Sequence, residues 1–350
     1  MSKSIIFFAF VVILGANCQY PVKKSKLPVL QQFLVINADL TDQYGRVSVS
    51  YTLSELSPRG GYIFPLPPAA TAYVEDSQGN RYFFDPSGVK DYDFKGVIGE
   101  TYQLFVTADG QSYVSEKETM RACPEIDSLT PNYAREAFRS PDDLLYDGFD
   151  VYAHFQDKPN EENFYQWDWV HYERTEACAF ETINNIVYKI PCTPYDCWGI
   201  YPNPRVIVQS DLLRDGASIA KKVIRVPYST PPQRYYLRVE QRSLTPSVFA
   251  YQKSLETQTQ GSGSIFDVPA QTKLNPNVKN VDDPSEQILG VFSVFSSRYK
   301  ILIINMQQSI PGATRKSTAD LIPWTPSPLL QAECVESATR TLIRPEGWVD

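Results

Sequence analysis

The chain has 350 residues, more than one compact core usually organises, so two domains are expected. The chain has a net charge of −7 and no basic cluster beyond the lysines of residues 23–26, so phosphate backbones repel it. A nucleic-acid partner is therefore not expected. The 22 tyrosines and 18 phenylalanines against 3 methionines favour strands, and hence an all-β fold.

The first 18 residues resemble a bacterial export signal. An apolar run from Ile5 to Leu14 follows one lysine, is too short to span a bilayer, and leads through small residues to Cys18. We expect residues 1–17 to be a lipoprotein signal peptide and Cys18 to be acylated, which would anchor the chain to a membrane. The alternative is a plain secretory signal with a chance cysteine.

Residues 18–27 are expected to form the lipid anchor and a linker, because they are short, basic and interrupted by proline. Lys23, Lys24 and Lys26 suit two interpretations equally. They either contact anionic headgroups or stay solvated.

Residues 28–118 alternate between strands and turns, which predicts an immunoglobulin-like β-sandwich. Val47, Val49 and Tyr51 alternate with polar residues, as in a half-buried strand. Two glycine-containing turns, at residues 78–80 and 109–110, each separate two β-prone segments and predict hairpins.

Residues 119–350 are expected to form a larger antiparallel β domain with one helix and an irregular C-terminal tail. The domain opens irregularly around Pro131 and Pro141. The helix is predicted at about residues 245–260, with Thr245 as N-cap and Pro246 in the first turn. Strands are predicted at 149–155, 164–174, 205–209, 219–226, 234–242, 287–295 and 299–305.

Five cysteines remain after Cys18, and an oxidising compartment makes them disulfide candidates: Cys123, Cys178, Cys192, Cys197 and Cys334. Two disulfides and one leftover thiol are the simplest count. The connectivity is open, although the turn-rich loop from Cys192 to Cys197 is one that could close on itself. A zinc cluster of three of these cysteines with His171 is the disfavoured alternative.

Catalytic motifs are absent from the sequence, and neither an enzyme, a cofactor nor a metal is expected. His154 and His171 lack metal-ligand spacing, and the chain has no nucleophile elbow, phosphate loop or dinucleotide fingerprint. Tyr165, Trp167 and Trp169 share one face of a predicted strand. They form either a platform on which a ligand stacks or, as we favour, a buried aromatic stripe.

Several segments resemble domain-of-unknown-function family 4249, outer-membrane lipoproteins of Bacteroidota, and their order along almost the whole mature chain carries the likeness. The matching segments are residues 94–104, 108–116, 124–129, 234–244, the helix with Tyr251, 263–269, 277–283, 289–292 and the closing 344–348.

The resemblance implies a partner, because members look like accessory lipoproteins encoded with TonB-dependent transporters. We therefore expect a non-enzymatic accessory or substrate-binding subunit of such a transporter barrel, with an unknown small-molecule or glycan cargo. The expected location is the outer membrane, lipid-anchored, on the cell surface rather than the periplasmic face. A surface structural or adhesive lipoprotein without a transporter is the alternative.

Overall fold

The computed structural model describes the chain in segments, and the predicted signal peptide, Cys18 and linker lie outside them. In the described part the protein is mainly β with one helix, so the predicted fold class is confirmed. No helix there is long and apolar enough to cross a membrane. The described residues are 32–52, 55–56, 62–63, 65–88, 92–140, 142–175, 180–183, 186–189, 197–230, 234–259, 274–317, 334 and 336–349.

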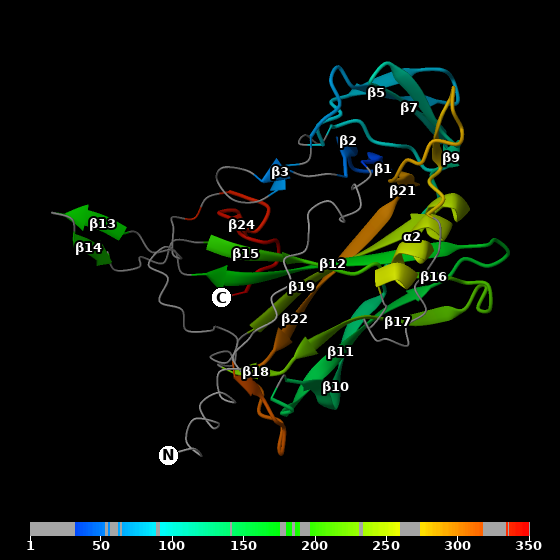
Figure 1. The fold of residues 1–350 in the computed structure, drawn as a ribbon. Coiled ribbons are helices and arrows are strands. Elements are labelled where there is room, and N and C mark those ends of the chain that lie inside the picture. The colour runs from blue at the N-terminus through cyan, green and yellow to red at the C-terminus, as the bar shows by residue number, and fades with distance from the viewer. Residues whose placement is uncertain are drawn as a thin grey trace, which may run out of the picture.

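The first of two sandwiches, whose N-terminal strands are blue to cyan in Figure 1, packs a small sheet against a larger one. The small sheet has the order β2-β1-β21, from Gly45–Tyr51, Leu34–Thr41 and Phe292–Phe295. The larger sheet has the order β20-β8-β7-β5-β6, from Val278–Asn280, Gln111–Ser115, Thr101–Ala108, Thr71–Asp76 and Arg81–Phe84, with β9 (Glu118–Thr119) beside β7. Alternate side chains of both sheets fill the core, which explains the period-two pattern of the sequence.

Both predicted hairpins are confirmed. β5 pairs with β6 and β7 with β8, both antiparallel. Gly79 has φ 84° and Gly110 has φ 75°, so each turn uses a backbone conformation that glycine adopts without strain.

Strands from far along the chain complete this sandwich. β20 pairs with β8, and β21 lies parallel to β1. Gly290, which precedes β21, has φ +99°, and a Cβ there would lie 2.1 Å from the carbonyl oxygen of Ile36. The sandwich is therefore not confined to residues 28–118 as expected, because two of its strands lie within the segment 119–350 that was assigned to the other domain.

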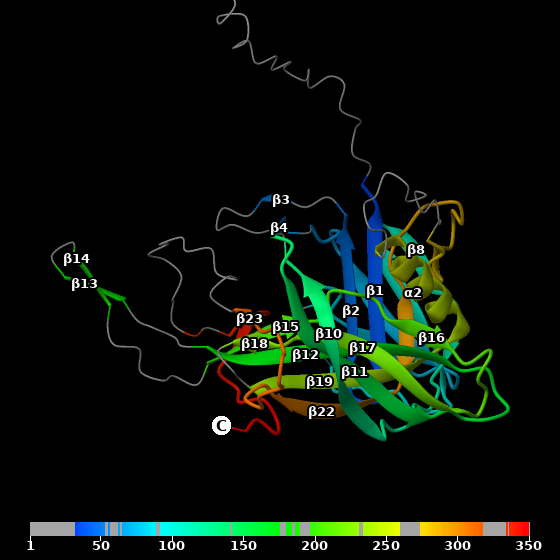
Figure 2. The ribbon, with the colours of Figure 1, turned by 90° about the horizontal axis from the view of Figure 1, so that it is seen from below.

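The second sandwich also has two layers, which Figure 2 shows crossing one another. One sheet has the order β10-β11-β17, from Ser128–Arg139, Leu145–Gln156 and Ser218–Pro227. The other has the order β22-β19-β12-β15-β24, from Ser297–Asn305, Arg234–Leu244, Phe164–Thr175, Cys197–Pro202 and Arg340–Thr341, with β16 (Val208–Ser210) also on β12. Three further pairs are β3 (Glu55–Leu56) with β4 (Tyr62–Ile63), β13 (Phe180–Ile183) with β14 (Ile186–Lys189), and β18 (Ser229–Thr230) with β23 (Lys316–Ser317).

The segment around Pro131 is a strand, β10, and the prediction of an irregular opening there was wrong. β10 is the edge strand of its sheet, where the missing N–H of a proline breaks no second ladder. Its pairing with β11 shifts register between Ala134 and Phe138. Glu136, inside this bulge, has φ 51° and donates its backbone N–H to Asp147 Oδ1 at 2.8 Å.

The helix α2 (Pro246–Thr259) confirms the predicted one and packs beside both sandwiches. Val248 and Tyr251 are buried in a small core with Phe164 of the second sandwich and Phe295 of the first. The Tyr251 hydroxyl accepts the Gly290 N–H at 3.0 Å. The helix therefore helps to hold β21 in place.

A short buried joint connects the sandwiches, and we define it by Cys123, Gln241 and Ser296. Ser296 alone separates β21 from β22, so one stretch of chain runs from one body into the other (Figure 1). Its hydroxyl accepts the Cys123 N–H and donates to the Arg121 carbonyl, both at 2.7 Å. The Ser296 carbonyl in turn accepts the Ser243 N–H of β19 at 3.2 Å.

Gln241 of β19 links the joint to the second core. Its side chain accepts Trp167 Nε1–H at 2.9 Å and donates to the Pro124 carbonyl at 3.1 Å. Both Gln241 and Trp167 are fully buried. A buried amide satisfied on both sides fixes the position of its neighbours, since any other arrangement leaves polar atoms unpaired.

Gln241→Leu should lower the free energy of unfolding by about 2–3 kcal/mol, because it leaves a buried indole N–H without a partner and removes the hydrogen bond to the Pro124 carbonyl. Urea denaturation measures the change. The control is Gln78→Leu in the exposed β5–β6 turn, which should change stability by less than about 0.5 kcal/mol. Equal stabilities for the two variants would contradict this role of the joint.

Asp150 should make the protein sensitive to acid. Arg225 donates to both its carboxylate oxygens, at 2.6 and 2.9 Å, and with Lys222 lowers the pKa of Asp150 to about 2. A lowered pKa stabilises the fold above the ordinary carboxyl pKa, and this contribution is lost as pH falls towards 2. We expect about 1–2 kcal/mol at neutral pH, reduced by the partial exposure of both cations. In Asp150→Asn, the loss of stability between pH 4 and pH 2 should be correspondingly smaller in acid-unfolding curves.

Candidate functional site

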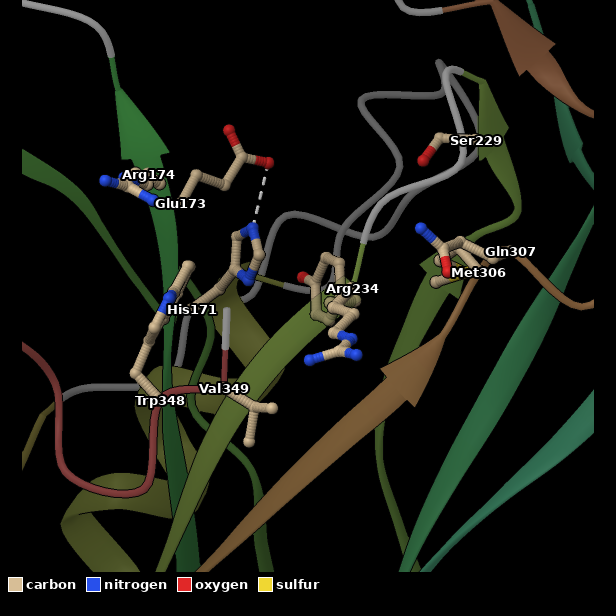
Figure 3. A pocket seen from close by; sticks show the side chains of 10 residues that line it. His171, Glu173, Arg174, Ser229, Arg234, Met306, Gln307, Trp348 and Val349 are labelled. Carbon is tan, nitrogen blue, oxygen red and sulfur yellow. Dashed lines mark hydrogen bonds and ion pairs between the residues drawn. The ribbon is translucent and has the colours of Figure 1, made fainter. Parts of the chain in front are cut away.

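A pocket of about 360 Å³ opens at one end of the second sandwich (Figure 3). Three strands, the segment after β22 and the last described segment of the chain contribute to it. Its lining residues are His171, Glu173 and Arg174 of β12, Arg234 and Tyr235 of β19, Ser229 of β18, Met306 and Gln307 after β22, and Trp348 and Val349 near the C-terminus.

Strand alternation explains how β12 builds both the core and the pocket. Tyr165, Trp167, Trp169, His171 and Glu173 occupy alternate positions and so share one face. Tyr165 and Trp167 are 1% and 0% exposed in the core of the second sandwich, and Trp169 packs against it. The platform interpretation of these aromatics was wrong for Tyr165 and Trp167, and the buried-stripe interpretation was right.

His171 is the most constrained side chain of the pocket. It is 5% exposed, and its ring stacks on Tyr235 with centroids 3.7 Å apart. Nδ1 lies 2.6 Å from the Tyr236 carbonyl oxygen and Nε2 lies 2.9 Å from Glu173 Oε1. Each ring nitrogen therefore lies within hydrogen-bond distance of an oxygen atom, and the ring is held from both ends.

Glu173 completes this pair. The hydrogen bond from His171 lowers the pKa of the Glu173 carboxyl, so the group is ionised at neutral pH. Burial, with a smaller contribution from Glu173, raises the pKa of the Tyr235 hydroxyl above its ordinary value. The wall formed by β12 and β19 therefore holds a His171–Glu173 contact stacked on the ring of Tyr235.

The arrangement does not form a serine-type catalytic centre. Ser229 lies across the pocket from His171 in Figure 3, with Gln307 and Met306. Both ring nitrogens of His171 already contact other acceptors, so neither is available to take a hydroxyl proton. The second histidine, His154, lies outside the pocket and contacts Thr130 Oγ1 at 2.7 Å.

Trp348, near the C-terminus, is held in the pocket wall by contacts between the C-terminal segment and the second sandwich. Its ring packs with those of Tyr236 and Trp198, with centroids 5.8 and 6.2 Å apart. The Tyr236 hydroxyl donates to the Glu346 carbonyl at 2.8 Å. The described part of the predicted irregular tail thus docks on the second sandwich, and β24 within it pairs with β15.

A disulfide between Cys197 and Cys334 ties this C-terminal segment to β15 across 137 residues of sequence. The suggested closure of the 192–197 loop on itself was therefore wrong, because Cys197 has a distant partner. Cys123 is a free, buried thiol rather than half of a disulfide, and burial raises its pKa to about 12, so it stays protonated. Cys178 and Cys192 lie outside the described residues.

One group of acidic side chains among the described residues has atoms close enough to share a cation. The ligand atoms of Asp157, Asp211 and Asp215 all lie within 4.8 Å of one another. Asp157 already accepts hydrogen bonds from the Tyr165 hydroxyl and the Gly216 N–H, and Asp211 from Asn163. These hydrogen bonds give both buried carboxylates a structural role, because each carboxylate fixes a loop.

The model of one protein family, Domain of unknown function (DUF4249), matches residues 21–301. The chain belongs to this family. No curated protein matches the chain. In this DUF4249 member the match covers the first sandwich, most of the second, the joint and the pocket residues of β12, β18 and β19. It ends within β22, before Met306, Cys334 and Trp348.

Sequence reasoning reached part of the pocket. Residues 234–244 and 344–348, which include Arg234 and Trp348, are among the family-like segments, and His171 was considered only as a member of the disfavoured zinc cluster. Glu173, Arg174, Ser229 and Gln307 were missed. The period-two continuation of the aromatic stripe from Trp169 was the available signal for Glu173.

Replacing both Cys197 and Cys334 with serine should reduce the free energy of unfolding by about 2–4 kcal/mol, because the disulfide closes a long loop. Urea denaturation without reductant measures this. The control is Ser337→Ala, which changes a residue of the same segment that takes part in no disulfide. It should change stability by less than about 0.5 kcal/mol. An unchanged double-serine variant would show that the bond does not hold the segment.

Proposed function

We propose that this protein is an outer-membrane lipoprotein, anchored through Cys18, that binds a ligand without transforming it. In this proposal it serves a TonB-dependent transporter as an accessory or substrate-binding subunit. The observation that carries the binding role is the pocket of the second sandwich with its immobilised His171.

Size and composition of the pocket support binding. Its volume lies in the range of small-molecule sites, and its lining combines aromatic rings with converging polar groups. The rigid strands β12 and β19 position the polar groups, which limits the entropy lost when a ligand binds. His171, whose two ring nitrogens both contact oxygen atoms, fixes the position of Glu173 in the wall.

The export signal and Cys18 support the membrane anchor. An acyl anchor at the start of the chain leaves both sandwiches outside the bilayer, where they can meet a membrane-embedded partner. The family-like segments support a transporter as that partner, with the cell surface as the location. A structural or adhesive surface lipoprotein is the competing proposal.

Wild-type protein from the source membrane should carry acyl mass at Cys18 and sediment with membranes, whereas Cys18→Ser should be largely soluble, because the lipid supplies the attachment. Membrane fractionation and intact mass measure this. Affinity purification of the wild type in mild detergent should bring down a barrel of transporter size. Cys123→Ser, which removes a cysteine from the folded body, is the control and should stay with the membrane.

Equal sedimentation of wild type and Cys18→Ser would contradict the anchor. An acylated protein that brings down no barrel would support the structural or adhesive alternative instead. Protease added to intact cells should degrade the protein if it lies on the cell surface, and protection would place it on the periplasmic face.

A further inference from the structure

We infer that the pocket of the second sandwich binds a neutral sugar, a ring compound with several hydroxyl groups and no charge. This inference rests on the proposed binding role and names the chemical class of its ligand. It follows from three features of the pocket: fixed charges of both signs, neutral hydrogen-bonding groups on the side opposite His171, and an aromatic ring held in its wall.

Charged residues of both signs border the pocket. The lowered pKa of the Glu173 carboxyl keeps this exposed group ionised at neutral pH. Arg174 and Arg234 line the same pocket, and each takes part in an interaction within the protein. A ligand of either charge therefore meets a fixed group of its own sign, and like charges repel. A neutral ligand avoids this cost.

Hydroxyl groups match the carboxylate in this wall. Glu173 Oε1 lies 2.9 Å from His171 Nε2, and the carboxylate keeps further acceptor sites, because its two oxygens together offer about four lone pairs. A hydroxyl group donates to such an acceptor without bringing a charge, and a hydrogen bond to a charged partner is stronger than one between neutral groups. His171 is buried, so it positions Glu173 and leaves the contact with the ligand to the carboxylate.

Neutral polar groups face this wall. Ser229 and Gln307 lie across the pocket from His171 (Figure 3). Among the described residues, neither side chain has a hydrogen-bond partner. A hydroxyl and an amide each donate and accept, as the hydroxyl groups of a sugar require. An apolar ligand would take these groups and Glu173 out of water without replacing their hydrogen bonds, which costs free energy.

Trp348 provides the aromatic surface. The centroid of its ring lies 5.8 Å from that of Tyr236 and 6.2 Å from that of Trp198, and the residue is only partly buried. The C–H groups on the face of a sugar ring are apolar and pack on an aromatic ring. Because its neighbours already fix the Trp348 ring, little side-chain entropy is lost when a sugar stacks on it.

The test is titration calorimetry on the full chain, purified in a detergent without a sugar headgroup. The probes are D-glucose and D-galactose, each with the acid that differs from it by a carboxylate, D-glucuronate and D-galacturonate. At least one neutral sugar should bind saturably, about fivefold or more tighter than its acid, because the acid faces Glu173. Its affinity should change less than about twofold as salt is raised, because no charge is neutralised on binding.

Variants of Trp348 and Glu173 test the assignment to this pocket. Trp348→Ala should weaken binding of the neutral sugar about 10-fold or more, and Trp348→Phe, which keeps a ring, should restore most of it. The control is Phe83→Ala, which removes a ring that is 70% exposed on β6 of the first sandwich and should leave the affinity within about twofold. Glu173→Gln should weaken the sugar about 3- to 10-fold and strengthen binding of the acid.

The opposite side of the pocket has its own variants. Ser229→Ala and Gln307→Ala each remove a hydrogen-bonding group and should weaken the neutral sugar about 3- to 10-fold. Gln78→Ala removes the same amide as Gln307→Ala from the exposed β5–β6 turn, outside the pocket, and should leave the affinity within about twofold.

The inference is overturned if neither neutral sugar binds, if each acid binds as tightly as its sugar or more tightly, or if Trp348→Ala and Phe83→Ala have the same effect. These outcomes are independent of membrane fractionation and barrel co-purification. A chain that binds a neutral sugar but brings down no barrel keeps the ligand class and loses the transporter. A chain that brings down a barrel but binds no neutral sugar keeps the transporter and loses the ligand class.

Discussion

The crossing of one stretch of chain through both sandwiches is the constraint on which the rest of the structure depends. Ser296 marks the point where β21 ends in the first sandwich and β22 begins in the second. Its hydroxyl is bonded to the connection between β9 and β10, and its carbonyl to β19 of the second sandwich. Gln241 continues the buried network to Trp167. These buried hydrogen bonds hold the two sandwiches together, because separating them would leave buried polar atoms without partners.

The same crossing connects the joint to the pocket. β22 pairs with β19 over its whole length, and β19 pairs with β12, which carries His171 and Glu173. Met306 and Gln307, directly after β22, form part of the opposite wall. The same strands thus form the joint at one end and the pocket at the other. Their packing therefore sets the geometry of the pocket.

Local signals in the sequence were enough for most strands and the helix. Alternation predicted β2 and β12, glycine turns predicted two hairpins, and Thr245-Pro246 marked the start of α2. Two features were beyond local signals. The parallel pairing of β21 with β1 depends on contacts between residues about 250 positions apart, and the partner of Cys197 depends on where the C-terminal segment docks. Pro131 misled the prediction because a proline is acceptable at a sheet edge, and the edge position is a property of the assembled sheet.

The late position of β20 and β21 in the chain sets an order for folding. A chain that is made from its N-terminus presents β1 and β8 long before their partner strands exist, so each keeps a bare strand edge during that interval. Exposed edges of this kind pair with other chains, so the new chain is prone to aggregate until β20 and β21 have joined the first sandwich. Truncation anywhere before residue 295 therefore leaves an aggregation-prone remnant instead of a smaller, stable N-terminal unit.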